Sequence, residues 1–114
     1  MLNAAEALAR AGGNKQLLGR VCQVFLENLP AMWTEIQTSV ANTDAAAIQR
    51  SAHTLKGSAS AIGAQAASAS ARDLEMIARS LTLDGAGTAL GRLEHELTQL
   101  RTAVADLRDQ SASC

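Results

Sequence analysis

The residues of this chain with the clearest capacity for chemistry are His53, Lys56 and Gly57, which lie within five consecutive positions. An imidazole is nucleophilic near neutral pH because its reference pKa is about 6.5. A lysine about one helical turn away can neutralise charge on a phosphoryl group attached to that ring. Glycine is unexpected here, since it costs roughly 1 kcal/mol relative to alanine inside a helix. The three residues predict a nucleophilic histidine beside a surface kept free of side chains.

Helical periodicity places this histidine on the outside of its helix. Apolar residues recur at spacings of three and four and form the stripe Ala45, Ile48, Ala52, Leu55, Ala59 and Ile62. On a wheel with His53 at zero, the stripe is centred at about 220° and Gly57 falls at about 40°. Ser60 falls at about 340° and Lys56 at about 300°. We therefore expect the imidazole to be exposed, with a bare glycine one turn ahead of it.

Composition predicts that the elements that carry this site are all helices. The 114 residues include 24 alanines and 15 leucines, but four valines, four isoleucines and no tyrosine. Alanine and leucine favour helix, whereas strands favour β-branched and aromatic residues. A chain of this length forms one domain and can bury about two-thirds of its unfolded surface. Neither a disulfide nor a metal is needed to hold it together.

Capping residues and apolar stripes divide the first half of the chain into helices. A short helix is predicted to begin at Asn3 and to end near the glycine pair at 12–13. A long helix follows Asn14 and contains Pro30, which predicts a kink or two helices meeting end to end. Asn42 and Thr43 offer caps for the next helix, which runs to about residue 63.

The second half of the chain predicts two more helices. One extends over about 64–80, a loop follows over 82–87, and the last helix carries the stripe Leu90, Leu93, Leu97, Leu100, Val104 and Leu107. Residues 110–114 are expected to form a frayed polar tail, so the domain is predicted to span 1–109. The predicted fold is all-α, an antiparallel four-helix bundle with a short extra N-terminal helix.

Charge and composition disfavour several partners. The net charge is -1, no run of lysine or arginine is present, and two aromatic residues are too few to stack on bases, so nucleic-acid binding is disfavoured. The apolar runs are far shorter than the roughly 20 residues that cross a bilayer, and no signal peptide is visible. Two cysteines make no disulfide framework. We expect a monomer in the cytoplasm without direct membrane contact.

The pattern His53-x-x-Lys56-Gly57, with Gly63 six residues further on, resembles the histidine phosphotransfer (HPt) domains of multistep phosphorelays. The resemblance covers residues 2–107. It includes the opening helix, Gly12-Gly13-Asn14, Leu17-Leu18, Phe25, Pro30 and Arg72-Asp73-Leu74-Glu75. It implies that His53 is phosphorylated and exchanges its phosphoryl group with the aspartate of a response-regulator receiver domain.

The resemblance also implies roles for the neighbours of His53. Lys56 would contact the phosphoryl group. Gly57, Ser60 and Gln49 would form the surface on which the receiver docks. Glu75 stands where many family members place a polar residue that hydrogen-bonds the second imidazole nitrogen. A carboxylate there would hold one tautomer and leave Nε2 free to attack, as the orienting residue does in a catalytic triad.

This mechanism requires no cofactor of the chain itself. The sequence contains no carboxylate cluster that could hold Mg²⁺, so that ion is expected on the receiver partner. Gly85 and Gly87 match no phosphate-binding loop, so the chain cannot load itself from ATP. We therefore expect a phosphocarrier without enzymatic activity. It would be the C-terminal module of a hybrid sensor histidine kinase, whose parent protein can be anchored in the inner membrane, although a free shuttle protein fits the sequence as well.

Alternative functions remain open at this point. One is the phosphotransfer module of a chemotaxis-type histidine kinase, and another is a helical interaction domain in which His53 is inert. The dimerising helix of a histidine kinase is excluded because Thr54 and Leu55 follow the histidine where an acidic residue is required. A di-metal bundle enzyme is disfavoured because no Glu-x-x-His pair occurs. His95 is expected to face solvent without a role.

Overall fold

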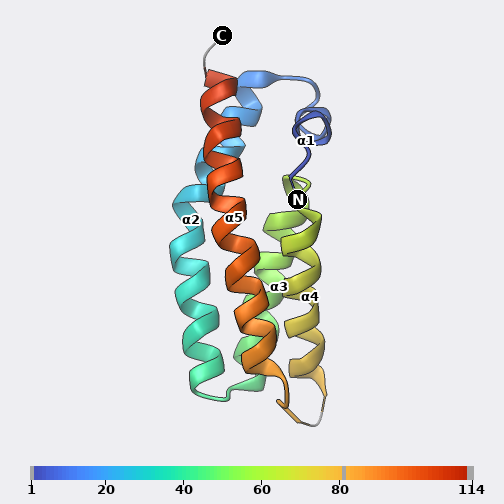
Figure 1. Ribbon diagram of the computed structural model, residues 1–114, viewed down its shortest axis with the longest axis vertical. Helices are drawn as coiled ribbons and strands as arrows, with labels where there is room; N and C mark the ends of the chain where they lie inside the picture. The colour runs from blue at the N-terminus through green and yellow to red at the C-terminus, as the bar shows by residue number, and fades with distance from the viewer. Residues whose placement is uncertain (1, 81, 113–114) are drawn as a thin grey trace.

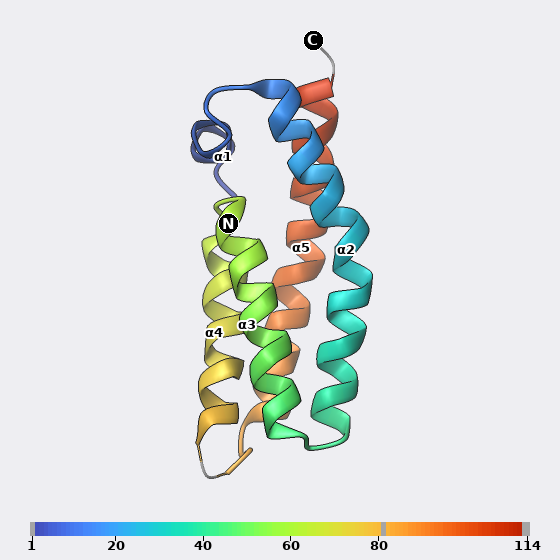
Figure 2. The ribbon, with the colours of Figure 1, turned by 180° about the vertical axis from the view of Figure 1, so that it is seen from behind.

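The computed structural model describes residues 2–80 and 82–112, and the regular elements in this part of the chain are all α-helices (Figure 1). They are α1 (Ala4–Arg10), α2 (Lys15–Ala41), α3 (Ala45–Ala61), α4 (Gln65–Arg79) and α5 (Ala86–Ala112). The four long helices run alternately up and down in a bundle 49 Å long, and α1 crosses beyond the ends of α3 and α4 (Figures 1 and 2). The predicted all-α bundle with a short extra helix is confirmed.

The core is built from the stripes that the periodicity predicts. The fully buried large side chains are Cys22, Leu29, Ile36, Ile48, Leu55, Leu74, Leu93 and Val104. Phe25 is also buried, while Met32 and Trp33 pack at the edge of the core. A core position for Met76 would be the natural expectation from its apolar side chain, but it is 57% exposed. The reason is that Met76 is two positions from the fully buried Leu74, which turns it about 200° from the core face.

Helix α2 passes through Pro30 without interruption, so the alternative of two helices meeting end to end is wrong. Proline removes one helical hydrogen bond and its ring crowds the preceding turn. Pro30 lies on the exposed side of α2, where the weakened turn faces water, and the preceding Leu29 is fully buried. Burial of the apolar stripe on the opposite side of α2 holds the helix together across this position.

The N-cap of α3 lies one residue after Thr43 and two after Asn42, the caps proposed from the sequence. Asn3 and Asn14 cap α1 and α2 as predicted, each accepting a backbone hydrogen bond at 3.0 Å. At α3, however, Asp44 is the N-cap and its Oδ1 accepts from the backbone N–H of Ala47 at 3.1 Å. Thr43 takes a left-handed conformation with φ 48°, so it forms the turn between α2 and α3 and cannot cap the helix.

Gly63 ends the helix that carries the histidine. Its φ is +77°, and the backbone N–H groups of Gly63 and Ala64 return to the carbonyl oxygens of Ser60 and Ala59. This paired arrangement is the Schellman motif, which favours glycine at the left-handed position. A Cβ at Gly63 would also lie 3.5 Å from Nε of Arg10, so α1 packs closely over this turn.

Helix α5 extends further than the sequence predicts. It continues to Ala112, so residues 110–112 are helical and the predicted frayed tail is wrong for them, while residues 113–114 lie outside the described part of the chain. Helices α2 and α5 project together past the ends of α3 and α4 (Figure 2). There Ser111 is buried, and its Cβ would be 3.6 Å from a Cβ at Gly19. This packing holds the polar end of α5 in helical form.

No helix within the described ranges is long and apolar enough to span a membrane.

The cap of α3 yields a test of the fold. Asp44→Ala should lower the free energy of unfolding by about 1 kcal/mol, because it removes a side-chain partner of the first turn of α3. Urea denaturation measures this directly. Asn42→Ala is the matched control and should change stability by less than about 0.5 kcal/mol. A larger loss from Asn42→Ala than from Asp44→Ala would show that the sequence-based cap was correct.

Candidate functional site

His53 lies on the outer face of α3, as the helical wheel predicts, and its side chain is 64% exposed. Gly57 follows one turn later on the same face. A Cβ built at Gly57 would meet nothing within 4 Å, so the packing of the bundle does not require a glycine there. The helix-weakening residue therefore opens the surface ahead of the imidazole without serving the contacts between helices.

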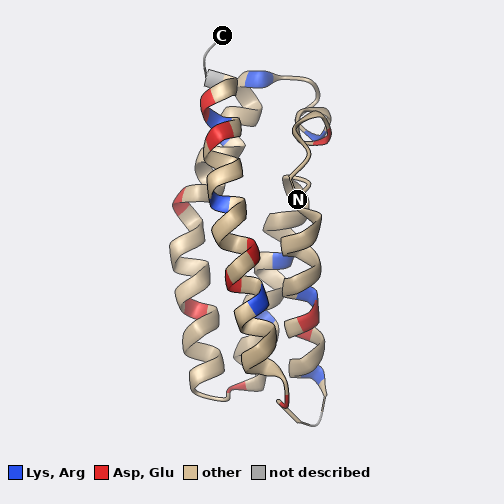
Figure 3. Cartoon of the chain, in the orientation of Figure 1, with Lys and Arg blue, Asp and Glu red and all other residues tan. Residues whose placement is uncertain are grey.

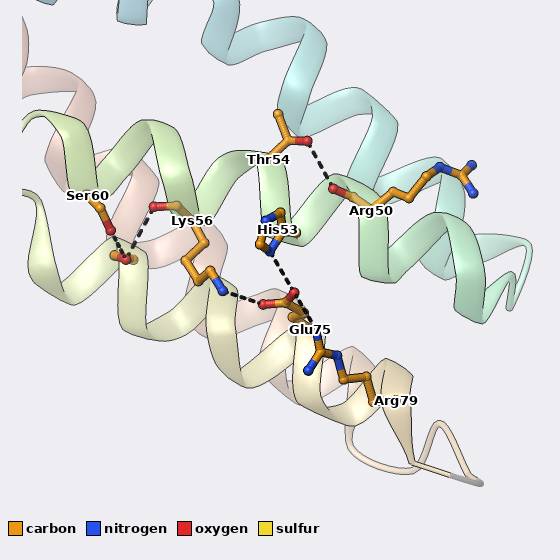
Figure 4. Close-up of polar contacts among 8 residues, drawn as sticks. Arg50, His53, Thr54, Lys56, Ser60, Glu75 and Arg79 are labelled. Carbon is orange, nitrogen blue, oxygen red and sulfur yellow. Dashed lines mark hydrogen bonds and ion pairs between the residues drawn. The ribbon is translucent and has the colours of Figure 1, made fainter.

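Glu75 of α4 reaches the ring of His53. Its Oε2 lies 2.8 Å from Nδ1, although the two residues are 22 positions apart (Figure 4). A neutral imidazole in this contact donates from Nδ1–H to the carboxylate, which leaves Nε2 as the unprotonated nitrogen. Nε2 has no hydrogen-bond partner within residues 2–80 and 82–112. The structure thus brings together the two residues whose contact the sequence could not establish.

The carboxylate of Glu75 is buried, and two cations neutralise it. Only 4% of its side chain is exposed. Lys56 Nζ donates to Oε1 at 2.8 Å, and Arg79 Nη2 donates to Oε2 at 3.3 Å. The hydrogen bond from Lys56 is the main cause that lowers the pKa of Glu75, followed by that from His53, while burial acts in the opposite direction. Glu75 is therefore ionised and charge-paired in the folded protein.

The residues expected to dock a partner occupy different environments. Gly57 is open to solvent. By contrast, the hydroxyl of Ser60 lies 2.7 Å from the hydroxyl of Ser68 on α4. The Ser68 hydroxyl also donates to the backbone carbonyl oxygen of Lys56. Ser60 therefore ties α3 to α4 through its hydroxyl. Gln49 is half-buried and lines a shallow depression together with His53.

Arg79 is the member of this cluster that sequence reasoning missed. It lies one turn after Glu75 on α4, with 60% of its side chain exposed. A signal was present, because residues four apart on a helix are neighbours and an Arg at that spacing pairs with a carboxylate. That signal becomes informative only once Glu75 is known to be buried, since most exposed pairs of this kind contribute little.

The second histidine and the acidic residues do not form a comparable site. His95 is exposed on α5, and its Nε2 lies 3.2 Å from Nε2 of Gln99, itself an exposed residue. Across the described ranges, no group of three or more His, Cys, Asp or Glu side chains could hold a metal ion. Within the described ranges, the polar cluster on this surface combines one exposed imidazole with a buried carboxylate and its two cations.

Comparison with known proteins agrees with this geometry. The sequence pattern of the family described as "Hpt domain" matches residues 20–103. The chain belongs to the Hpt domain family. The search of curated protein sequences returned no significant match. Among solved structures, the HPT domain of the Hpt sensor hybrid histidine kinase from Shewanella is similar, with a TM-score of 0.84 and 24% identity over 96% of this chain and 94% of that chain.

Family membership gives the coarse function. Hpt domains are phosphocarriers of two-component signalling, and they interact with the receiver domains of response regulators. The likeness to the Shewanella Hpt domain shows that the two chains share the helical fold. In the present chain, the exposed His53 lies on α3, the second long helix of the bundle, opposite Glu75 of α4, the third (Figure 4).

The lowered pKa of Glu75 predicts how stability changes with pH. The charged form is favoured in the folded state, so its contribution is fully present above the usual value of 4.5 and is lost as pH falls through the lower folded pKa. Urea denaturation of the wild type at a series of pH values should show this acid-induced loss. Glu75→Gln should be less stable at neutral pH and should have a flatter pH profile below 4.5.

Glu94→Gln makes the same change at an exposed position of α5 and should follow the wild-type profile. If Glu75→Gln and the wild type lost stability in parallel on acidification, the charge of Glu75 would contribute nothing to folding.

Proposed function

We propose that His53 accepts a phosphoryl group from the phosphoaspartate of a receiver domain and donates it to the aspartate of another. The observation that carries this proposal is the contact between Nδ1 of His53 and the buried carboxylate of Glu75 on an exposed ring. In the neutral imidazole this contact makes Nε2 the nitrogen with the free electron pair. A nucleophile needs a free electron pair and access to its substrate, and Nε2 has both.

The transfer step can be written without any proton leaving the site. The Nε2 electron pair attacks phosphorus, an N–P bond forms, and the bond between phosphorus and the aspartyl oxygen breaks, releasing the carboxylate of the receiver. The Nδ1 proton stays where it is, so the product is an imidazolium ring that carries the phosphoryl group on Nε2. Glu75, ionised and 2.8 Å from Nδ1, stabilises this positive ring by charge and hydrogen bonding. Transfer to the next aspartate is the same step in reverse.

The neighbours of His53 support the reaction in different ways. In the unmodified protein Lys56 keeps Glu75 charged. After transfer its ammonium group, which pairs with the same carboxylate as His53, would also contact the phosphoryl oxygens. Gly57 leaves the surface open for the receiver, and Gln49 lines the depression beside the ring. Ser60 contributes through its link to α4, which positions the turn of α3 beyond Gly57.

The remaining components of the reaction would come from other domains. Phosphoryl transfer is mainly positioning plus electrostatic stabilisation, and Mg²⁺ would be held by the receiver. The similar Shewanella domain belongs to a sensor hybrid histidine kinase, which supports the same setting for this chain, as a module of a hybrid kinase that works in the cytoplasm. In that setting this chain is a carrier and the parent kinase supplies the ATP-dependent step.

Phosphorylation of His53 can be tested directly. A receiver domain phosphorylated with acetyl phosphate should label the wild type with an acid-labile, base-stable phosphate, because the product is an N-phosphoryl histidine. His53→Gln should remain unlabelled, and His95→Gln, the matched control on α5, should be labelled like the wild type. Label that survives in His53→Gln would place the acceptor elsewhere.

Gly57 tests whether the open surface admits the partner. Gly57→Gln should leave stability unchanged or raise it by up to roughly 1 kcal/mol, because a Cβ there meets no atom within 4 Å and glycine weakens a helix. Transfer from the receiver should fall steeply, since bulk lies one turn from His53 in the same ridge. Thermal melts and transfer rates measure the two effects separately.

Gly91→Gln on α5 is the control, because Gly91 is also helical, exposed and free of neighbours within 4 Å. It should stabilise the helix without slowing transfer. Normal transfer by Gly57→Gln would show that the receiver approaches His53 from another direction.

A further inference from the structure

The charges of this chain are segregated between the helices of the site and the rest of the molecule. Residues 45–79, which include α3 and α4, contain four cations and two carboxylates, a net charge of +2. The remaining residues contain six cations and nine carboxylates, a net charge of -3. A nearly neutral chain therefore places a local excess of positive charge on the two helices that carry His53 and Glu75, as Figure 3 shows on α3 and α4.

The two carboxylates of this segment do not offset the cations on the face around His53. Glu75 is buried and is already neutralised by its contacts. Asp73 lies on the other side of α4, where it lines a depression against α5 together with Arg92 and Gly85. The face around His53 is left with cations as its exposed charges from α3 and α4.

Those cations surround the site on both sides. One shallow depression beside Glu75 is lined by Lys56, Arg72, Met76 and Arg79, and a second is lined by Gln49, Arg50, His53 and Arg79. Both depressions include Glu75, so the carboxylate lies at the boundary between them. Arg50 and Arg72 therefore stand at opposite ends of a continuous surface with the imidazole and its carboxylate between them.

These two arginines have no function in holding the site together. Lys56 and Arg79 pair with Glu75. Arg50 and Arg72 are exposed residues, and their guanidinium groups have no hydrogen-bond or ion-pair partner within the described residues. In Figure 4 the side chain of Arg50 extends away from the cluster. One buried carboxylate does not need four cations, so the surplus charge is available to something outside the chain.

We propose that Arg50 and Arg72 make this face a docking surface for a partner whose own face is acidic around its phosphoaspartate. The inference rests on the proposed function and adds the electrostatic character of the receiver. Complementary charge accelerates encounter and suppresses partners of the wrong sign, whereas it adds little to a step that occurs after docking. Arg50 and Arg72 therefore act on association, and His53 with Glu75 acts on transfer.

The test separates association from transfer. The experiment uses a receiver that labels wild-type His53 and that has been phosphorylated with acetyl phosphate. Single-turnover transfer is followed at limiting and at saturating concentrations of this receiver, each over a range of salt concentrations. For the wild type the second-order rate constant should fall as salt rises. The double variant Arg50→Gln with Arg72→Gln should lose about tenfold in that constant at low salt and most of its salt dependence. The rate at saturation should stay within about twofold, because electrostatic steering acts before docking.

Arg92→Gln with Arg101→Gln makes the same change in net charge on exposed positions of α5 and is the control. It should behave like the wild type. A second-order constant that does not depend on salt, or equal losses in the two double variants, would overturn the docking surface while leaving transfer to His53 intact. Absence of label on wild-type His53 with every receiver tried would instead overturn the proposed function and this inference with it.

Discussion

The buried carboxylate of Glu75 is the constraint on which the site depends. An ionised group with 4% of its side chain exposed would cost several kcal/mol without partners, so the fold has to bring positive charge and hydrogen-bond donors to it. Lys56 and His53 come from α3, and Arg79 comes from the same helix as the carboxylate. These contacts are satisfied together at one register of α3 against α4. The interaction that makes burial of the charge tolerable therefore also determines where the imidazole stands.

Small side chains allow the two helices to approach closely enough for these contacts. On their core-facing stripes α3 and α4 bury alanines with exposures of 2% or less, namely Ala52, Ala59, Ala67 and Ala71. The distance between packed helices depends on the side chains at the contact, so alanines permit a short one. Ser60 and Ser68 then bridge the helices by a direct hydrogen bond. The alanine-rich composition that predicts helices in the sequence thus also serves to align the polar cluster.

The sequence predicts the features that depend on neighbouring residues along the chain. It does not predict those that depend on contacts between helices. The outward position of His53 and the open surface at Gly57 depend on the helical period alone, which is local. The contact between His53 and Glu75 depends on the register between two helices, and the residues themselves point to it only through the resemblance to a family. Asp44 caps α3 because the preceding turn uses a left-handed residue, and Ser111 is helical because α2 extends to meet it. The cap at Asp44 and the helical state of Ser111 both depend on tertiary packing, which cannot be predicted from the residue pattern of a single helix.

The two cations on Glu75 differ in how firmly they are held, and under the proposed function that difference matters. A phosphoryl group on Nε2 would bring a second anion to the cluster, and both cations would be attracted to it. Lys56 donates at 2.8 Å with 28% of its side chain exposed, whereas Arg79 donates at 3.3 Å with 60% exposed. Arg79 thus loses less by turning toward the new charge, and Lys56 can stay on the carboxylate or share its three donors between both anions. Glu75 then remains ionised in both states, so the imidazolium keeps its counter-charge while the receivers exchange.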